Sequence, residues 1–123
     1  MKEYKVLLDD KLIGTTKFEF ADVPMGVVYG KLEFVDIENP YLFFIDYCKK
    51  NEIEYSFIES EKYLNTFIIK NLKVLYDSNL VLTCNCSING FENDYQIDAY
   101  NIEESVMKTL FISHYYDYFG KTD

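Results

Sequence analysis

Two runs of alternating apolar and polar residues flank Asn89-Gly90, and this pattern constrains the fold more than any other part of the chain. An Asn-Gly pair between two such runs is typical of a two-residue β-hairpin turn, because both positions accept a positive φ. The pattern therefore predicts a hairpin with one mostly apolar face and one almost wholly polar face. The predicted pairs are Ile88/Phe91, Cys86/Asn93, Cys84/Tyr95, Leu82/Ile97 and Leu80/Ala99 on the apolar face, and Ser87/Glu92, Asn85/Asp94, Thr83/Gln96 and Val81/Asp98 on the polar face.

The same alternation predicts further strands elsewhere in the chain. They cover residues 3–9, 12–20, 27–35, 53–60 and 66–76. The first two are joined through Asp9-Asp10-Lys11, and the last turns through Asp77-Ser78-Asn79 into the hairpin. This second turn places Tyr76 by Leu80, Val74 by Leu82, Leu72 by Cys84 and Ile68 by Ile88.

Two segments have the spacing of helices. Asn39 is a suitable N-cap for the first, Pro40 suits its first position, and Lys49, Lys50 and Asn51 suit its end. The second covers residues 101–120, where Asn101 followed by Glu104 is a capping-box pattern and Gly120 is a suitable end. The apolar stripes are Tyr41, Leu42, Phe44, Ile45 and Cys48 in the first helix, and Ile102, Val106, Met107, Leu110, Phe111 and His114 in the second.

These elements predict an α+β fold, an antiparallel sheet of about six to seven strands with two helices packed on one face. The chain has no internal repeat and no Gly/Ser/Pro-rich linker, so we expect a single domain over residues 1–123. Hydrophobic residues make up 49% of the 123 residues, enough for a core without a metal or a disulfide.

The charge of the chain excludes one class of partner. Asp and Glu number 21 against 12 Lys, there is no Arg, and the net charge is −9. A surface that follows a phosphate backbone needs clustered positive charge, so direct nucleic-acid binding is excluded. The chain has no apolar run of about 18 residues, and its N-terminus lacks the apolar stretch of a signal peptide. We therefore expect a cytoplasmic protein that does not enter a membrane.

The three cysteines lack the paired spacing of a zinc site, and an odd number argues against a disulfide framework. We interpret Cys84 and Cys86, which share one face of a predicted strand, as small buried hydrophobes. No sequence pattern of a phosphate loop, a dinucleotide site or a nucleophilic hydrolase is present. His114 is the sole histidine, and its apolar stripe favours a packed residue at the core margin over a catalytic base. The prediction is that the chain is not an enzyme and holds no metal or cofactor.

Three acids, Glu92, Asp94 and Asp98, are predicted on one exposed strand face. Side chains two positions apart along a strand, such as those of Glu92 and Asp94, are about 7 Å from each other. Such a row is most often a solvated sheet face. The sharper hypothesis is a docking surface for a basic partner, because acid rows speed association with cationic proteins. A divalent-metal site is a third alternative, although a flat strand cannot wrap an ion.

Tyrosine is the other compositional bias, with twelve residues in a chain that has no Trp. Tyr is enriched at protein interfaces because it supplies rigid area and a hydroxyl group. Tyr115, Tyr116 and Tyr118 cannot all face the core, so at least one is expected at the surface. The predicted partner-binding residues are Glu92, Asp94, Tyr95, Asp98, Tyr100, Glu103, Glu104, Tyr115 and Tyr116.

One segment, Ile13-Gly14-Thr15-Thr16 followed by residues 21–31 (Ala-Asp-Val-Pro-Met-Gly-Val-Val-Tyr-Gly-Lys), resembles a stretch seen in small bacterial proteins. The short, acidic, Tyr-rich chain as a whole is similar to the immunity proteins of bacterial polymorphic and contact-dependent toxin systems. That resemblance implies a cytoplasmic antidote that covers the active site or a flank of a cognate toxin, often a basic nuclease. Two alternatives stay open: a small-ligand or enzymatic domain with a pocket near residues 24–30, and a self-assembling structural protein.

Overall fold

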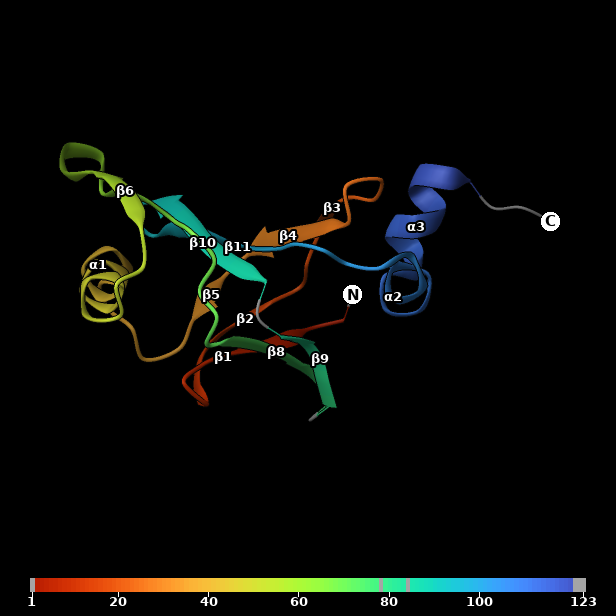
Figure 1. Ribbon diagram of the computed structural model, residues 1–123, viewed down its shortest axis with the longest axis horizontal. Helices are drawn as coiled ribbons and strands as arrows, with labels where there is room; N and C mark the ends of the chain where they lie inside the picture. The colour runs from red at the N-terminus through yellow and green to blue at the C-terminus, as the bar shows by residue number, and fades with distance from the viewer. Residues whose placement is uncertain (1, 78, 84, 121–123) are drawn as a thin grey trace.

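In a computed structural model, which describes residues 2–77, 79–83 and 85–120, the chain forms two antiparallel sheets with helices at both ends (Figure 1). The five-stranded sheet has the order β5-β2-β1-β8-β9, with β5 (Glu33–Phe34), β2 (Lys11–Thr16), β1 (Tyr4–Leu8), β8 (Leu72–Tyr76) and β9 (Asn79–Thr83). The six-stranded sheet has the order β3-β4-β11-β10-β7-β6, with β3 (Phe20–Asp22), β4 (Val27–Lys31), β11 (Asp94–Ala99), β10 (Cys86–Phe91), β7 (Tyr63–Thr66) and β6 (Tyr55–Ile58).

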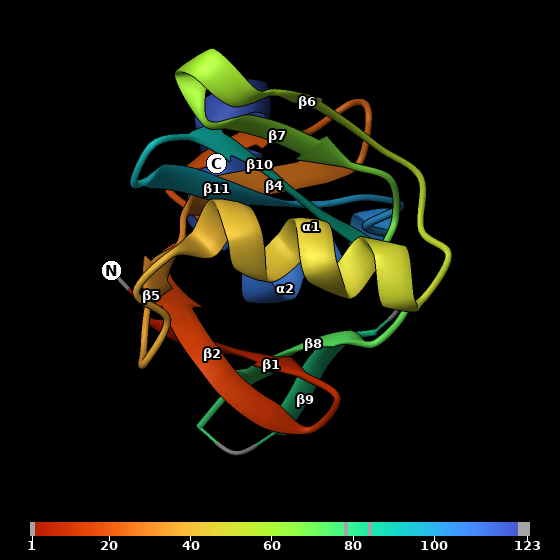
Figure 2. The same ribbon diagram turned by 90° about the vertical axis from the view of Figure 1, so that its left-hand side faces the viewer.

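The helices close the two ends of this pair of sheets. Helix α1 (Pro40–Lys50) lies at one end, and α2 (Glu104–Leu110) and α3 (Ile112–Phe119) lie at the other (Figures 1 and 2). A short 3-10 helix, η1 (Glu59–Glu61), joins β6 to β7. The predicted α+β class is confirmed, whereas the single sheet with both helices on one face is replaced by two sheets with a helical layer at each end. Within the described residues, no helix is long and apolar enough to cross a membrane.

Four of the predicted strands are each divided between the two sheets: those over residues 12–20, 27–35 and 66–76, and the first strand of the predicted hairpin. β2 continues into β3, β4 into β5, β7 into β8, and β9 into β10, and in each case the second strand belongs to the other sheet. The corner residues Phe18 and Leu32 are both only 1% exposed, and Ile69 is fully buried. Backbone hydrogen bonds fix two of these corners, from Leu32 N to Tyr95 O at 2.9 Å and from Ile69 N to Cys86 O at 2.8 Å. The strands therefore bend into a closed, two-sheet core, as strands do that change sheets at a corner.

The predicted hairpin forms with a different turn. Phe91 pairs with Asp94, so Glu92 and Asn93 make the turn, and Asn89-Gly90 lies inside β10. Gly90 is required there because a Cβ on it would lie 2.6 Å from the Cα of Tyr95. Ile88 pairs with Ile97, whereas the prediction paired it with Phe91. The register of the second strand is thus shifted by an even number of residues, which keeps each side chain on its predicted face. The apolar face therefore still holds Cys86, Ile88, Tyr95, Ile97 and Ala99. In the preceding hairpin the predicted pairing of Val74 with Leu82 is confirmed, while Tyr76 pairs with Asn79.

Helix α1 follows its prediction closely. The Asn39 side chain accepts a hydrogen bond from Leu42 N at 3.2 Å, Pro40 occupies the first position, and Asn51 is the C-cap. The second predicted helix is wrong in two respects. Asn101 has a φ of 60° and the N-cap is Glu103, so the capping box does not form. The helix also breaks at Phe111, whose side chain is 4% exposed and packs against Tyr4 and Phe18.

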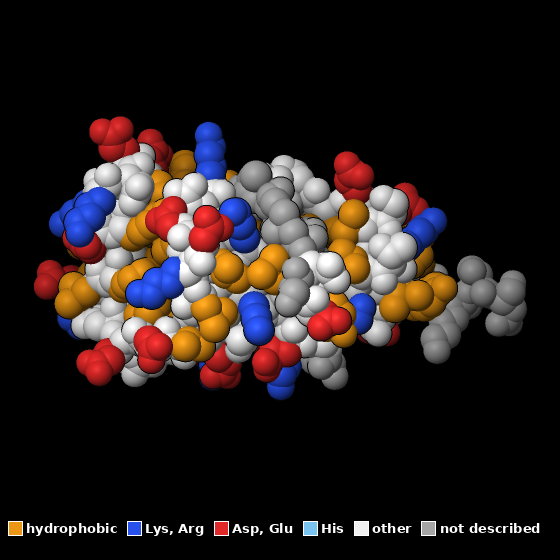
Figure 3. All heavy atoms as spheres, turned by 90° about the horizontal axis from the view of Figure 1, so that it is seen from below, with side chains coloured by type: hydrophobic (Ala, Val, Ile, Leu, Met, Phe, Trp, Pro, Cys, Tyr) orange, Lys and Arg blue, Asp and Glu red, His pale blue; other side chains and the backbone are white. Residues whose placement is uncertain are grey.

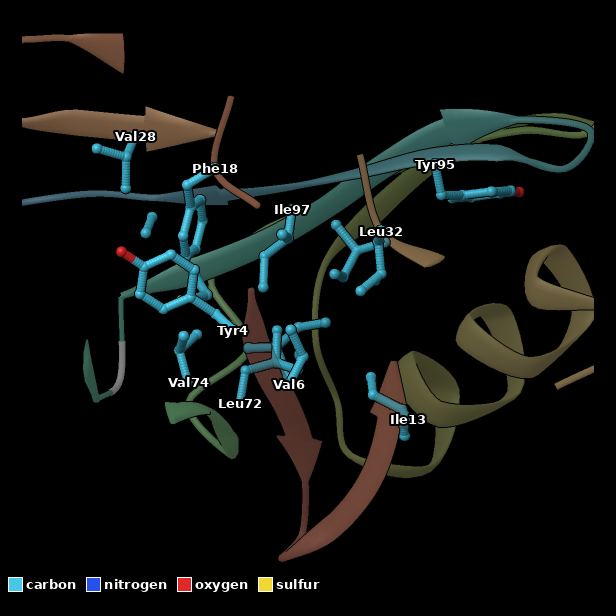
Figure 4. Close-up of a cluster of buried hydrophobic side chains, with 14 of the residues drawn as sticks. Tyr4, Val6, Ile13, Phe18, Val28, Leu32, Leu72, Val74, Tyr95 and Ile97 are labelled. Carbon is cyan, nitrogen blue, oxygen red and sulfur yellow. The ribbon is translucent and has the colours of Figure 1, made fainter. Parts of the chain in front are cut away.

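The main core lies between the two sheets (Figure 4). Val6, Leu72 and Val74 of the five-stranded sheet and Val28, Ile88 and Ile97 of the six-stranded sheet are all fully buried. Cys48 and Cys86 are both buried, which confirms the expected burial of Cys86, and Cys84 lies outside the described residues. Burial raises the pKa of the Cys48 thiol to about 11.

Candidate functional site

The outer face of the six-stranded sheet, the face turned away from the core, carries most of the acids that the sequence singled out. No described helix lies over it in Figures 1 and 2. The strand registers arrange its side chains in three rows that cross the sheet. They are Ser87, Asp98, Tyr29 and Phe20; Ser56, Asn65, Asn89, Gln96 and Lys31; and Ile58, Tyr63, Phe91 and Asp94.

The opposite side of the molecule, formed by the five-stranded sheet, has a different character. Figure 3 views this side and shows apolar, basic and acidic side chains intermingled over it. A surface of mixed sign gives no preference for a cationic or an anionic partner. The outer face of the six-stranded sheet is therefore the better candidate for selective binding.

Asp98 lies at the centre of a hydrogen-bond network on this outer face. Its carboxylate accepts hydrogen bonds from Asn89 Nδ2 at 2.8 Å, Gln96 Nε2 at 2.7 Å and Tyr100 OH at 3.2 Å. The hydroxyl groups of Tyr100 and Ser87 are 3.0 Å apart. Burial raises the pKa of Tyr100, and the neighbouring Asp98 carboxylate raises it further. Asp98 and Tyr100 thus stabilise the sheet itself, and the oxygens of the Asp98 carboxylate accept their hydrogen bonds from within the face.

Glu92 and Asp94 are exposed at one corner of the same face. Phe91, which is 53% exposed, pairs with Asp94, and Ile58, which is 47% exposed, lies on the other side of Tyr63 in the same row. The backbone of the turn is held to the η1 connection by a hydrogen bond from Glu92 N to Lys62 O at 3.2 Å. We refer to this region as the acidic corner; its residues are Ile58, Glu61, Tyr63, Phe91, Glu92 and Asp94.

Positive charge is directed away from the acidic corner. Lys62 is adjacent in sequence, but its Nζ lies 5.5 Å from the centre of the Tyr41 ring, and Tyr41 is a buried residue of α1. The acids of the corner make no ion pair with a described lysine. Exposed Phe91 thus lies opposite Asp94, an acid that forms no ion pair with a described lysine.

Tyr95 is not part of any exposed surface, which corrects its predicted place at a partner interface. It is 1% exposed, its hydroxyl donates to Lys62 O at 3.1 Å, and its ring packs edge-on against Phe34. Burial raises the pKa of Tyr95 to about 12. The alternation that places Asp94 and Asp98 on the outer face necessarily places Tyr95 on the inner one.

The remaining predicted residues lie at the other end of the molecule, with α2 and α3 (Figure 1). Glu104 accepts a hydrogen bond from Tyr115 OH at 3.3 Å and forms an ion pair with Lys108 at 3.3 Å. Tyr116 and Tyr118 are 38% and 58% exposed, which confirms that part of this tyrosine cluster reaches the surface. Glu103 and Glu104 also line a cavity of about 590 Å³ together with the loop between β3 and β4. The structure therefore separates this group from the acidic corner.

Two side chains of the acidic corner, Phe91 and Ile58, were missed by the sequence argument. Moving the turn from Asn89-Gly90 to Glu92-Asn93 transfers Phe91 from the second strand of the hairpin to the first. Because side chains alternate along a strand, this transfer places Phe91 on the outer face instead of in the core. The polar run Glu92-Asn93-Asp94 directly after Phe91 was the signal that could have indicated the correct turn position.

No protein-family model matches this chain, and no match was found among curated proteins or solved structures. Over residues 2–77, 79–83 and 85–120, no group of three His, Cys, Asp or Glu side chains lies where it could hold a metal ion. His114 packs as expected at the core margin, where its Nε2 donates to Phe18 O at 2.6 Å.

Proposed function

We propose that the chain is a non-catalytic protein-binding module, an immunity protein that neutralises a basic, nuclease-type bacterial toxin through the acidic corner. The observation that carries this proposal is the combination of exposed Phe91 and Ile58 with three exposed acids, Glu61, Glu92 and Asp94, that form no ion pair with a described lysine. An apolar centre with a charged rim is the usual composition of a protein-protein hot spot. Negative charge on the rim selects a cationic partner and speeds its approach.

Inhibition of a nuclease by such a surface needs no catalytic group. A nuclease cleft is basic because it binds phosphates, and carboxylates at similar spacing compete for the same lysines and arginines. Glu92 and Asp94 lie at the ends of the same turn and can enter such a cleft together. The acidic corner would therefore bind the positively charged cleft in which the toxin holds its nucleic-acid substrate.

The size of the outer face suits a partner of moderate size. Six strands spaced about 4.8 Å apart give a face about 24 Å across. A standard interface buries about 800 Å² per partner, so the acidic corner and the neighbouring rows can supply it together. Phe20, which is 56% exposed and stacks on Tyr29 at 5.4 Å, provides a second apolar contact at the far side of the face.

The test uses two triple variants with the same change of net charge. Glu61→Lys, Glu92→Lys and Asp94→Lys reverse the acidic corner, and Glu3→Lys, Glu38→Lys and Asp117→Lys reverse exposed acids outside it. Tagged wild-type and variant proteins capture partners from lysate of the native host at low and high salt, with identification by mass spectrometry. The captured protein is then expressed alone and with each variant in susceptible cells.

The expected result is a basic toxin that arrests growth alone and is neutralised by the wild type and by the control variant. The acidic-corner variant should bind it at least about tenfold more weakly and fail to protect. Equal protection by both variants would show that the acidic corner is not the interface. Concentration-dependent self-association in light scattering, with no captured toxin, would favour the structural alternative instead.

A further inference from the structure

A second surface, independent of the proposed function, has the opposite charge. A cavity of about 420 Å³ lies where β1 and β8 meet the junction of α2 and α3. Its lining includes Lys2, Lys17, Tyr4, Tyr76, Phe111 and His114. Among the described residues no Asp or Glu lines it, although acids outnumber lysines by 21 to 12 in the chain.

Two other cavities that the described residues form do not share this property. The cavity beside α2 is lined by Glu103 and Glu104 and by no lysine, and the one beside α1 has Asp9 and Asp36 against Lys11. A concave surface lined by one sign of charge raises the local concentration of ligands of the other sign. The cavity at the α2–α3 junction is therefore suited to an anion.

The two lysines are not used in ion pairs within the described residues. The Lys2 Nζ lies 5.3 Å from the centre of the Tyr76 ring and 3.5 Å from Leu110 O, and Lys17 is exposed at the rim. The four ion pairs of the described chain use Lys31, Lys50, Lys73 and Lys108. A ligand anion could bind both Lys2 and Lys17 without breaking an existing ion pair.

The floor of the cavity is aromatic. The ring of Tyr4 lies 5.6 Å from that of Tyr76, 5.8 Å from that of Phe111 and 5.2 Å from that of Phe18. Tyr76 and the neighbouring Ile112 are 36% and 45% exposed, so part of this apolar surface is accessible. Small-molecule sites typically have volumes of about 300–1,000 Å³ and combine apolar walls with a few polar groups.

We propose that this cavity binds a small aromatic anion. The carboxylate or phosphate of the ligand pairs with Lys2 and Lys17, and its ring lies on Tyr76 and Ile112. The hydrogen bond from His114 Nε2 to Phe18 O holds the wall of the cavity in place, which leaves the lysines to select the charge.

The test titrates the full chain with phenyl phosphate and benzoate as probes, and with inorganic phosphate and phenol as controls that lack the ring or the charge. Binding is followed by calorimetry and by the amide signals of a ¹⁵N-labelled sample. The expected result is saturable binding of the two aryl anions, with signal shifts centred on Lys17 and residues 111–114. Inorganic phosphate and phenol should each bind at least about tenfold more weakly.

A pair of double variants identifies the lysines. Lys2→Gln with Lys17→Gln should weaken phenyl phosphate binding roughly tenfold, while Lys5→Gln with Lys70→Gln, which remove equal charge elsewhere, should change it less than about twofold. All four positions are exposed, so the fold should persist, and circular dichroism checks it. Equal losses in the two double variants, or no saturable binding of either aryl anion at about 10 mM, would overturn the proposal. The triple variant of the acidic corner should bind phenyl phosphate normally, so the two proposals fail separately.

Discussion

His114 donates a hydrogen bond from Nε2 to the carbonyl oxygen of Phe18 at 2.6 Å, although 96 residues separate the two in sequence. Phe18 lies at the corner where the chain passes from β2 in one sheet to β3 in the other, and its φ is 45°. The imidazole ring also lies against Phe111, with 6.5 Å between ring centres. The sole histidine therefore ties α3 to a strained corner of the sheets.

Replacing His114 with alanine should lower the free energy of unfolding by about 1–3 kcal/mol, because the carbonyl of the buried Phe18 loses its partner. Urea denaturation measures the change. Ser113→Ala, at the exposed neighbouring position, is the control and should change stability by less than about 0.5 kcal/mol. A His114→Ala variant as stable as this control would mean that the hydrogen bond does not contribute.

Gly30→Ala should destabilise the same corner from the other side. A Cβ at this position would lie 2.9 Å from both the Cα and the N of Phe18, and it would also meet the Glu19 carboxylate. We expect a loss of about 1–3 kcal/mol in thermal or urea unfolding, because the backbone must move apart. Ser56→Ala, at an exposed site of the same sheet, should be nearly neutral. An unchanged melting temperature for Gly30→Ala would contradict the close approach.

Removal of the Asp98 carboxylate should cost far more stability than removal of Asp94. Asp98→Ala leaves Asn89, Gln96 and Tyr100 without their shared acceptor, with an expected loss of about 1–3 kcal/mol. Asp94→Ala removes an exposed carboxylate and should stay within about 0.5 kcal/mol of the wild type. Chemical denaturation of both variants measures the difference, and equal stability would refute the structural role given to Asp98.

Glu92→Gly should stabilise the chain by about 0.5–1 kcal/mol, because glycine accepts the positive φ of this turn position. Glu92→Ala is the matched control: it removes the carboxylate but keeps the strain, so no gain is expected. Partner binding should weaken in both variants. If Glu92→Ala also stabilised the chain, the gain in both variants would come from removal of the negative charge and not from relief of backbone strain.

Alkaline pH should destabilise the fold through two buried acids. The pKa of Cys48 rises from 9.0 to about 11, and that of Tyr95 from 10.0 to about 12. Both groups are uncharged in the fold, so above pH 9.0 the unfolded chain loses these protons first and binds fewer of them. The free energy of unfolding should therefore be unaffected by these groups below pH 9.0 and fall as the pH rises toward 12.

Urea midpoints measured from pH 8 to pH 11 test this dependence. The double variant Cys48→Ala and Tyr95→Phe should lose stability less steeply over the same range, because neither position then releases a proton. Iodoacetamide at pH 8 should label Cys48 only after unfolding, since its thiolate is scarce in the fold. Rapid labelling of Cys48 in the native protein would contradict its burial.

The ends of the helices and the faces of the strands were determined by residues close to them in the sequence. Asn39-Pro40 and Asn51 define α1, and Gly120 ends α3, because caps satisfy backbone groups within a few residues of themselves. The side-chain alternation also placed Asp94, Gln96 and Asp98 on one face of β11, and this assignment survives the shifted turn. Both results depend on interactions that span only a few positions of the chain.

The arrangement of these elements was decided by the tertiary structure. Alternation continues unbroken through Leu32 and Phe18, so the pattern cannot distinguish a straight strand from one that bends into a second sheet. The turn forms at Glu92-Asn93 and not at Asn89-Gly90, and Gly90 instead permits the close approach of the Tyr95 backbone within the sheet. Phe91 consequently reaches the surface beside Asp94, and α3 is held to the Phe18 corner by His114. Composition and spacing therefore determined the class of fold and the sign of its charge, while long-range packing decided which side chains meet at each surface.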